Sequence, residues 1–269
     1  MKIVIVSDVH GNLEAFRALV EAEPCDQLWV LGDLVDYGPD PRTVIRDVRD
    51  LAALVVRGNH DHAVGFGVAP RCSAAFRAMA EATQQYTMRV LGDDDVAYLR
   101  ALPLAADATR GGVRFHLCHA VPSDPLFGYC RADSPAWAQE VRAVDAGVLL
   151  VGHTHEPFVR AVGDRLVVNP GSLGQPKHGT PDGSYAVWEA GEVSLRRVRY
   201  RVDTTVDKLR RLPLASDVID DLAQVLLTGL PPAAAGPPPE VDGGDARSGP
   251  AGPDGGAQRD RPRPSRCGQ

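Results

Sequence analysis

The feature that most constrains this chain is a series of short apolar runs, each of which ends in a polar cluster. Five runs rich in Val, Ile and Leu occupy residues 3–6, 28–31, 53–56, 113–118 and 148–151. Amphipathic helical patterns separate the first three runs. This alternation is typical of a layered α/β fold in which crossover helices join parallel strands.

The polar clusters that follow these runs have related compositions. They read Ser7-Asp8-Val9-His10, Gly32-Asp33-Leu34-Val35-Asp36, Gly58-Asn59-His60-Asp61, His119-Ala120 and Gly152-His153-Thr154-His155. In open α/β sheets the ligand site lies beyond the carboxyl ends of the strands, so the five clusters are predicted to meet at one edge. One such cluster is usually a turn. Five in the same relative position indicate a site.

The residue types in these clusters favour a metal centre. Asp8 and His10 are two residues apart, as are His153 and His155, so in extended backbone both members of each pair point the same way. Imidazole and carboxylate without thiolate favour Mn, Fe, Zn, Ni or Co. The candidates outnumber the ligands that one ion needs, which favours two ions. A two-metal centre suits displacement at phosphorus.

The charge balance restricts the partners. The formal net charge is −6, which argues against a nucleic-acid polymer because phosphate neutralisation needs a basic surface. No apolar run approaches the roughly 18 residues of a membrane span, and the first acid comes too soon for a signal-peptide core, so we expect a cytoplasmic protein without membrane attachment. Two divalent ions beside Asp8 and Asp33 would still leave a locally positive pocket for an anionic substrate.

The remaining sequence divides into a folded body and a tail. Residues 73–102 keep a helical period that Gly92 divides, residues 158–198 alternate as two hairpins, and two amphipathic segments follow near 205–211 and 216–227. We expect the segment 71–102 to wall the pocket and set substrate size. Residues 231–269 hold nine of the 22 prolines and no Leu, Ile, Phe, Met, Trp or Tyr, so a disordered tail is predicted after a 1–230 domain.

Taken in order, these motifs resemble a known superfamily. The set D-x-H, G-D-x-x-D, G-N-H-D, a strand-final His and G-H-x-H is similar to that of the calcineurin-like metallophosphoesterases, and the match runs from residue 1 to about residue 174. The resemblance implies a four-layered αββα sandwich, two mixed sheets flanked by helices, with a binuclear metal site at the carboxyl ends of the strands. It implies a hydrolase of phosphoric esters.

The resemblance also implies a role for each motif residue. Asp8, His10 and His155 would hold the first metal, Asp33 would bridge, and Asn59, His119 and His153 would hold the second. His60 would protonate the leaving group or stabilise the transition state, and Asp36 would orient His60. Two divalent ions, with Mn as the first expectation, would present a metal-bridging hydroxide that attacks phosphorus directly.

Substrate contacts and substrate identity are the less constrained expectations. Arg57, Tyr37, Asn59, Lys177 and His178 are the candidate substrate-binding residues, and a small phosphomonoester or phosphodiester is the expected substrate. Protein serine/threonine phosphatases and dinucleoside tetraphosphatases carry G-D-x-x-D-R-G, whereas this chain has Tyr37 in place of the arginine. That disfavours both of these alternatives. A third alternative is a non-catalytic metal-binding interaction module.

Overall fold

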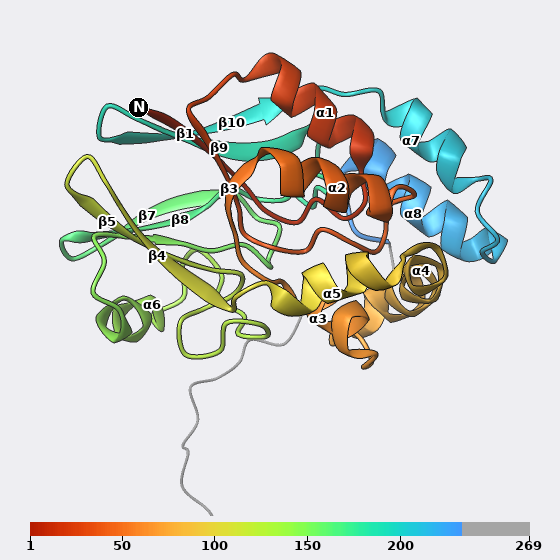
Figure 1. Cartoon of the computed structure of the whole chain (residues 1–269), viewed down its shortest axis with the longest axis horizontal. Helices are drawn as coiled ribbons and strands as arrows, with labels where there is room; N and C mark the ends of the chain where they lie inside the picture. Colours follow the sequence, from red (N-terminus) through yellow and green to blue (C-terminus); the bar gives the residue numbers. More distant parts are fainter. Residues whose placement is uncertain (233–269) are drawn as a thin grey trace, which may run out of the picture.

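The apolar runs become strands of two five-stranded mixed sheets in the computed structural model, which describes residues 1–232 (Figure 1). The first sheet has the spatial order β10 (Glu192–Val198), β9 (Gly183–Glu189), β1 (Lys2–Val6), β2 (Gln27–Val30) and β3 (Ala52–Val55). The second has the order β4 (Ala105–Arg110), β5 (Val113–Cys118), β6 (Val148–Leu150), β8 (Arg165–Asn169) and β7 (Phe158–Val162).

The strand pairing in both sheets mixes directions. β1 pairs parallel with β2 and antiparallel with β9, and β2 pairs parallel with β3. In the second sheet β5, β6 and β8 run parallel, and the edge strands β4 and β7 pair antiparallel with their neighbours. The parallel strands therefore end at one side of each sheet, which is where the polar clusters begin.

Apolar side chains from the two sheets form the inner core. Ile5, Leu31, Phe115 and Leu150 are each at most 1 % exposed and belong to one cluster between the sheets. The Phe115 ring packs edge-on against Trp188 at 5.0 Å between centroids. Alternation along each strand sends the neighbouring residues to the outer faces, where helices cover them.

Helices complete the two outer layers. α1 (Leu13–Ala22) and α2 (Pro41–Leu51) cover the first sheet, whereas α6 (Trp137–Glu140) and the 3₁₀ turn Val141–Ala143 lie against the second (Figure 1). The Asn12 side chain accepts a hydrogen bond from the Ala15 backbone N–H and caps α1. Asp40 precedes α2 without a side-chain cap bond, and its carboxylate accepts from Lys208 Nζ at 2.7 Å. The predicted αββα sandwich is confirmed.

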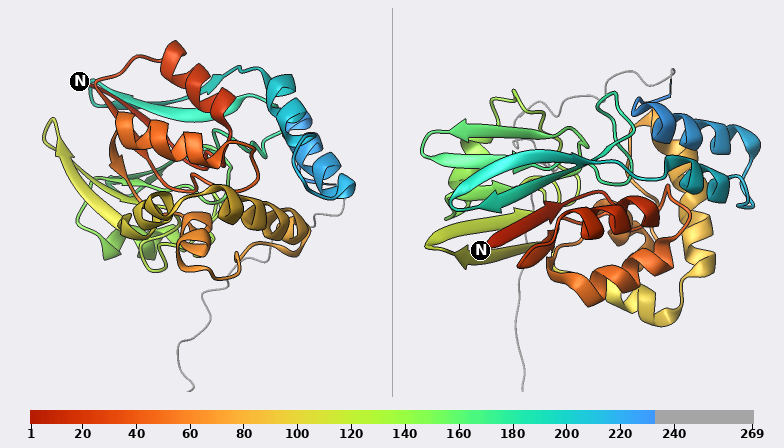
Figure 2. Two further views of the ribbon diagram at one scale, coloured as in Figure 1. Left: turned by 45° about the vertical axis from the view of Figure 1, so that its right-hand side comes forward. Right: turned by 90° about the horizontal axis from the view of Figure 1, so that it is seen from above.

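The other helices gather at one end of the sheets (Figure 2). They are α3 (Asn59–Phe66), the 3₁₀ turn Ala74–Phe76, α4 (Arg77–Val90), α5 (Asp93–Ala101), α7 (Val202–Leu209) and α8 (Ser216–Thr228). Apolar residues of α4, α7 and α8 share a cluster that includes Tyr37. β1 and β2 point their carboxyl ends toward this helical end, so the helices border the edge where the polar clusters meet (Figure 2).

The elements that were not expected from the sequence include β4, α3 and the short helix α6. β4 has the weakly apolar sequence AADATR and is a strand because it pairs with β5 along its whole length. α3 begins inside the G-N-H-D cluster, whose polar residues hide the helical period.

From residue 233 onward, the predicted tail lies outside the residues that the structure describes. Within residues 1–232, no helix combines the length and the apolar character needed to cross a bilayer.

Candidate metal centre

The polar clusters meet at the carboxyl ends of the strands in an unusual backbone conformation. Of the eight non-glycine residues with positive φ in the described chain, seven belong to these clusters or directly follow one. They are Asp8, His10, Asp33, Asp36, Tyr37, His153 and His155. Asp and His tolerate this left-handed region better than most residues, but each instance still costs free energy. Such strain persists only where the surrounding structure holds it, and it concentrates at functional sites.

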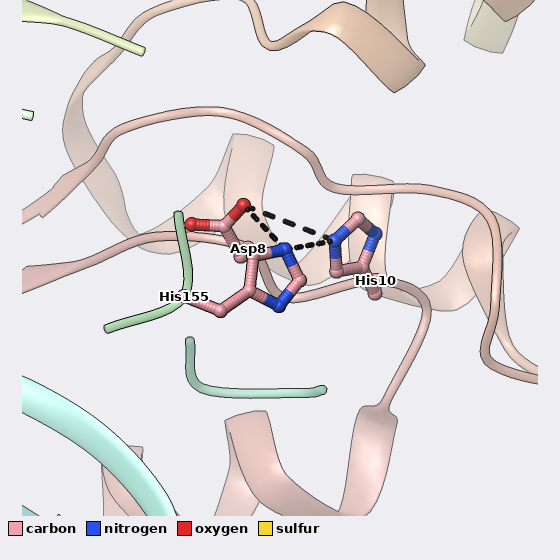
Figure 3. A group of neighbouring side chains, drawn as sticks. All are labelled: Asp8, His10 and His155. Atoms are coloured by element: carbon pink, nitrogen blue, oxygen red, sulfur yellow. Dashed lines mark hydrogen bonds and ion pairs between the residues drawn. The ribbon is translucent and has the colours of Figure 1, made fainter. Parts of the chain in front are cut away.

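The first group of ligand atoms comes from Asp8, His10 and His155 (Figure 3). His155 Nε2 lies 3.2 Å from Asp8 Oδ1 and 3.3 Å from His10 Nε2, and His10 Nε2 lies 3.8 Å from the same carboxylate oxygen. All three side chains are almost completely buried. Residues 145 positions apart along the chain therefore point their donor atoms at one place.

The hydrogen bonds of the two imidazoles show that this group fits a cation. His10 Nδ1 faces the Val35 carbonyl at 2.9 Å, and His155 Nδ1 faces the Gln175 carbonyl at 2.7 Å. Because a carbonyl only accepts, each Nδ1 carries the proton and each Nε2 of the neutral ring keeps a lone pair. Two lone pairs then face each other beside Asp8 Oδ1, a buried oxygen without a hydrogen-bond donor. A divalent ion would satisfy all three atoms.

A second group joins Asp8 to Asp33 and His119. His119 Nε2 lies 3.3 Å from Asp33 Oδ2 and 3.0 Å from Asn59 Oδ1, while its Nδ1 faces the Leu31 carbonyl at 2.8 Å. Asp33 Oδ2 is also 3.8 Å from His10 Nε2, so this carboxylate lies between the two groups. The chemistry of this set, one amide oxygen with carboxylates and an imidazole nitrogen, also suits a divalent ion.

His153 borders both groups without joining either. Its ring packs edge-on against that of His119 at 5.1 Å between centroids, and its backbone N–H donates to Asp8 Oδ2 at 3.2 Å. Gly152 precedes it at a close contact with Ser7, where a Cβ atom would lie 1.9 Å from the serine Oγ. The glycine is therefore required for the loop that carries His153 and His155 to approach β1.

Protonation states favour ligation at several of these residues. Burial lowers the pKa of His10 well below its usual range and that of His153 to about 3, so both rings are neutral at pH 7. Burial tends to raise the pKa of Asp33, but His119 and His60 lower it well below its usual range. Burial lowers the pKa of His119, yet Asp33 raises it to about 9 overall. A metal bound there would displace that proton.

His60 and Asp36 form a buried pair beside the metal-ligand candidates. His60 Nδ1 lies 2.9 Å from Asp36 Oδ2, and the His60 backbone N–H donates to Asp33 Oδ1 at 2.9 Å. The His60 ring lies edge-on to that of His10, 5.1 Å away between centroids. Burial opposes the charge on His60, but Asp33 and the hydrogen bond to Asp36 raise its pKa overall. The pair therefore holds one imidazole in a fixed orientation.

A cavity of about 840 Å³ opens onto this centre. Asp33, Asn59, His60, His153 and His155 belong to its lining. The rest of its wall combines aromatic and cationic side chains, mainly Tyr37, Phe76, Phe127, Tyr129, Arg71, Arg77, Arg131 and Lys177. Its volume suits a small organic ligand that is much larger than a bare phosphate.

The substrate-contact candidates from the sequence divide between this cavity and its surroundings. Tyr37 and Lys177 line the cavity with Asn59. Arg57 lies outside the lining, because its guanidinium donates to the Arg100 carbonyl at 2.8 Å and stacks on Phe66. His178 is also outside. Arg57 and His178 therefore stay predicted substrate contacts that lie outside the cavity lining.

Sequence reasoning missed the part of the cavity lining that lies between β5 and α6. Phe127, Tyr129 and Arg131 carry no motif, whereas Arg71 stands at the start of the predicted wall. Only their composition, aromatic residues beside arginines near a metal motif, could have drawn attention to them. The predicted pocket wall between residues 71 and 102 contributes its first part, up to Glu81.

Comparison with known proteins defines the class to which this fold and centre belong. The sequence model of the calcineurin-like phosphoesterase superfamily domain matches residues 1–192, and the chain belongs to this family. A metallophosphoesterase from Sphaerobacter thermophilus has a similar crystal structure, with a TM-score of 0.71 at 32 % identity. The similarity covers 84 % of this chain and 99 % of that one. The chain is therefore a hydrolase that acts on phosphoric esters, from a family that uses divalent metals.

The curated relatives give less information about the reaction than the family does. MJ0912 from Methanocaldococcus jannaschii, an uncharacterized protein, is 28 % identical over 78 % of this chain and 93 % of its own length. A symmetrical bis(5'-nucleosyl)-tetraphosphatase from Aromatoleum aromaticum is 35 % identical over 154 residues, which are 55 % of this chain. The match spans 53 % of that enzyme, so about half of its length has a counterpart here.

Proposed function

We propose that this phosphoesterase hydrolyses a small phosphorylated molecule, either a phosphomonoester or a phosphodiester, at a centre of two divalent ions. Asp8, His10 and His155 would hold one ion, Asn59, His119 and His153 the other, and Asp33 would bridge. Mn is the first expectation, and Fe, Zn, Ni and Co suit the same donors. When bound, the ions would neutralise phosphoryl oxygens and activate the attacking water.

The observation that carries this proposal is the position of the His60–Asp36 pair. Because His60 Nδ1 is engaged by Asp36 at 2.9 Å, Nε2 is the nitrogen left to act on a ligand in the cavity. The carboxylates of Asp33 and Asp36 favour the protonated form of the His60 ring. His60 would therefore donate a proton to the leaving oxygen, and Asp36 would fix the ring for that transfer.

Lys177 is the proposed phosphate contact in the cavity. Its ammonium lies 4.1 Å from the centroid of the Phe76 ring, and among the described residues no hydrogen bond or ion pair engages it. Burial lowers its pKa to about 8, so the side chain remains largely charged at pH 7. A phosphoryl oxygen would supply the missing counter-charge.

The experiment compares His60→Asn with the wild-type enzyme on phosphoesters whose leaving groups differ in basicity. Loss of a general acid should lower kcat by about 10²–10⁴-fold for an alkyl phosphate and much less for p-nitrophenyl phosphate. Metal content by elemental analysis should stay unchanged. His62→Asn is the matched control, since His62 follows His60 by two residues on α3 and its ring packs against Phe66. Equal losses for all leaving groups would contradict the acid role.

A second candidate is hydrolysis of dinucleoside tetraphosphates, and the identity to the Aromatoleum enzyme favours it. Tyr37 stands where those enzymes are expected to carry arginine, which argues against the same phosphate contact. An assay of metal-loaded protein on diadenosine tetraphosphate separates the two candidates.

A protein phosphatase is also disfavoured, because Tyr37 replaces the arginine of that group as well, and a phosphopeptide assay tests this alternative. Full metal loading without turnover on any phosphoester would instead favour a non-catalytic metal-binding module.

A further inference from the structure

We propose that Arg71 forms a second anion subsite in the cavity, which selects substrates that carry another phosphate or carboxylate group away from the scissile phosphate. The inference rests on the proposed phosphoesterase function and concerns a residue that no motif includes. It follows from how Arg71 is held, from the charges around it and from the size of the cavity.

Arg71 is fixed at two points. Its backbone carbonyl accepts a hydrogen bond from Asn59 Nδ2 at 3.4 Å, which ties this segment to the metal-ligand candidates. Its guanidinium carbon lies 4.2 Å from the centroid of the Phe127 ring, which belongs to a different loop. Stacking on an aromatic face orients the planar guanidinium and leaves its N–H groups at the edges free to donate.

The charge of Arg71 is uncompensated within residues 1–232. No acidic group lies within 4.0 Å of its guanidinium, and no hydrogen bond from that group is formed to another residue. Arg131 on the same wall differs, because it lies 3.6 Å from a Glu156 oxygen. Arg77 also lines the cavity but stacks on no aromatic ring. Arg71 is therefore both oriented and unpaired, as a binding group for an anion should be.

The cavity has room for a ligand that reaches both places. Its volume of about 840 Å³ includes the metal-ligand candidates at one end and Arg71 with Phe127 in the wall. A bare phosphate at the metal centre would leave most of that space unused. A substrate with a second anion would instead use the guanidinium through a forked, charge-assisted contact.

The test measures binding without turnover. Alkane-1,n-bisphosphonates with spacers of three to six carbons, and the matching ω-hydroxyalkyl monophosphonates, are titrated into the full-length Mn²⁺-loaded protein by calorimetry. For at least one spacer, the wild-type protein should bind the bisphosphonate about tenfold more tightly than its monophosphonate, as one charge-assisted contact provides. In Arg71→Leu this ratio should fall below about threefold, and Phe127→Leu should give an intermediate ratio.

Control variants and rates separate this inference from the proposed function. Arg89→Leu removes an exposed arginine outside the cavity lining and should keep the wild-type ratio. Rates on p-nitrophenyl phosphate test the proposed function alone, and those of the wild-type protein and Arg89→Leu should agree within threefold. A wild-type ratio near one at every spacer, or an unchanged ratio in Arg71→Leu, would overturn the second subsite even if the enzyme is active.

Discussion

Glu23 provides a prediction whose magnitude follows from the structure. Its carboxylate closes the carboxyl end of α1 and accepts from Tyr185 Oη at 2.7 Å and from Arg196 Nη1 at 2.9 Å, with Lys2 Nζ on its other oxygen. Burial acts to raise its pKa, but these three donors outweigh burial and lower the pKa from 4.5 to about 2. The folded state therefore stabilises the charged Glu23 carboxylate more than the unfolded state does.

The expected effect of Glu23→Gln is a loss of about 2 kcal/mol in the free energy of unfolding at pH 7. The difference between 4.5 and about 2 corresponds to about 3 kcal/mol, at 1.36 kcal/mol for each pH unit. Arg196 is 41 % exposed, so water and salt screen part of this energy. Because the folded-state pKa is depressed, the stabilisation is complete above pH 4.5 and disappears as the pH falls toward 2.

Urea unfolding of metal-free protein, followed by circular dichroism between pH 7 and pH 3, measures this difference. The gap between wild type and Glu23→Gln should shrink steadily below pH 4.5. Glu21→Gln is the matched control on the same helix, since Glu21 is exposed and forms no ion pair among the described residues. A gap that stays constant with pH would show that Glu23 acts through packing and not through its charge, which refutes the reasoning.

Further predictions concern the core, the metal centre and the tail. Phe115→Ala should destabilise the protein by about 3–5 kcal/mol in urea unfolding, because the ring is 1 % exposed between the sheets. Gly58→Ala should lower metal content by elemental analysis, because its Cβ would lie 2.0 Å from Asp33 Oδ1, whereas Gly65→Ala, with contacts of 3.4 Å or more, should retain it. Deletion after Pro232 should leave kcat/KM within about twofold, since the removed residues lack large apolar side chains.

The apolar runs predicted their strands within one or two residues. This holds for β1, β2, β5 and β6 inside the sheets and for β3 at an edge, because packing in the sandwich favours apolar residues along each of them. β4 was missed because an edge strand with one exposed face needs few apolar residues, and its pairing with β5 decides its structure. α3 was missed because its first turn carries side chains of the candidate site, which removes the helical pattern.

The candidate site shows the same division. The sequence named the residues, since ligand chemistry restricts residue type and each cluster directly follows a strand. Their distances required the fold, because His155 reaches Asp8 only when two sheets stack and the loop at Gly152 presses against Ser7. Arg57 illustrates the limit, since a position next to a motif does not determine where a long side chain points.

The chain by itself determined the layered class, the order of the strands along the sequence and the chemistry of the centre, because burial and metal ligation act on residue type at each position. Tertiary structure alone decided that the Nε2 atoms of His10 and His155 face each other, that the buried His10 ring is neutral, and that Arg71 lies over Phe127 in the cavity wall. Those properties depend on distances between segments that are remote in sequence, and such distances exist only after the sheets and helices have packed.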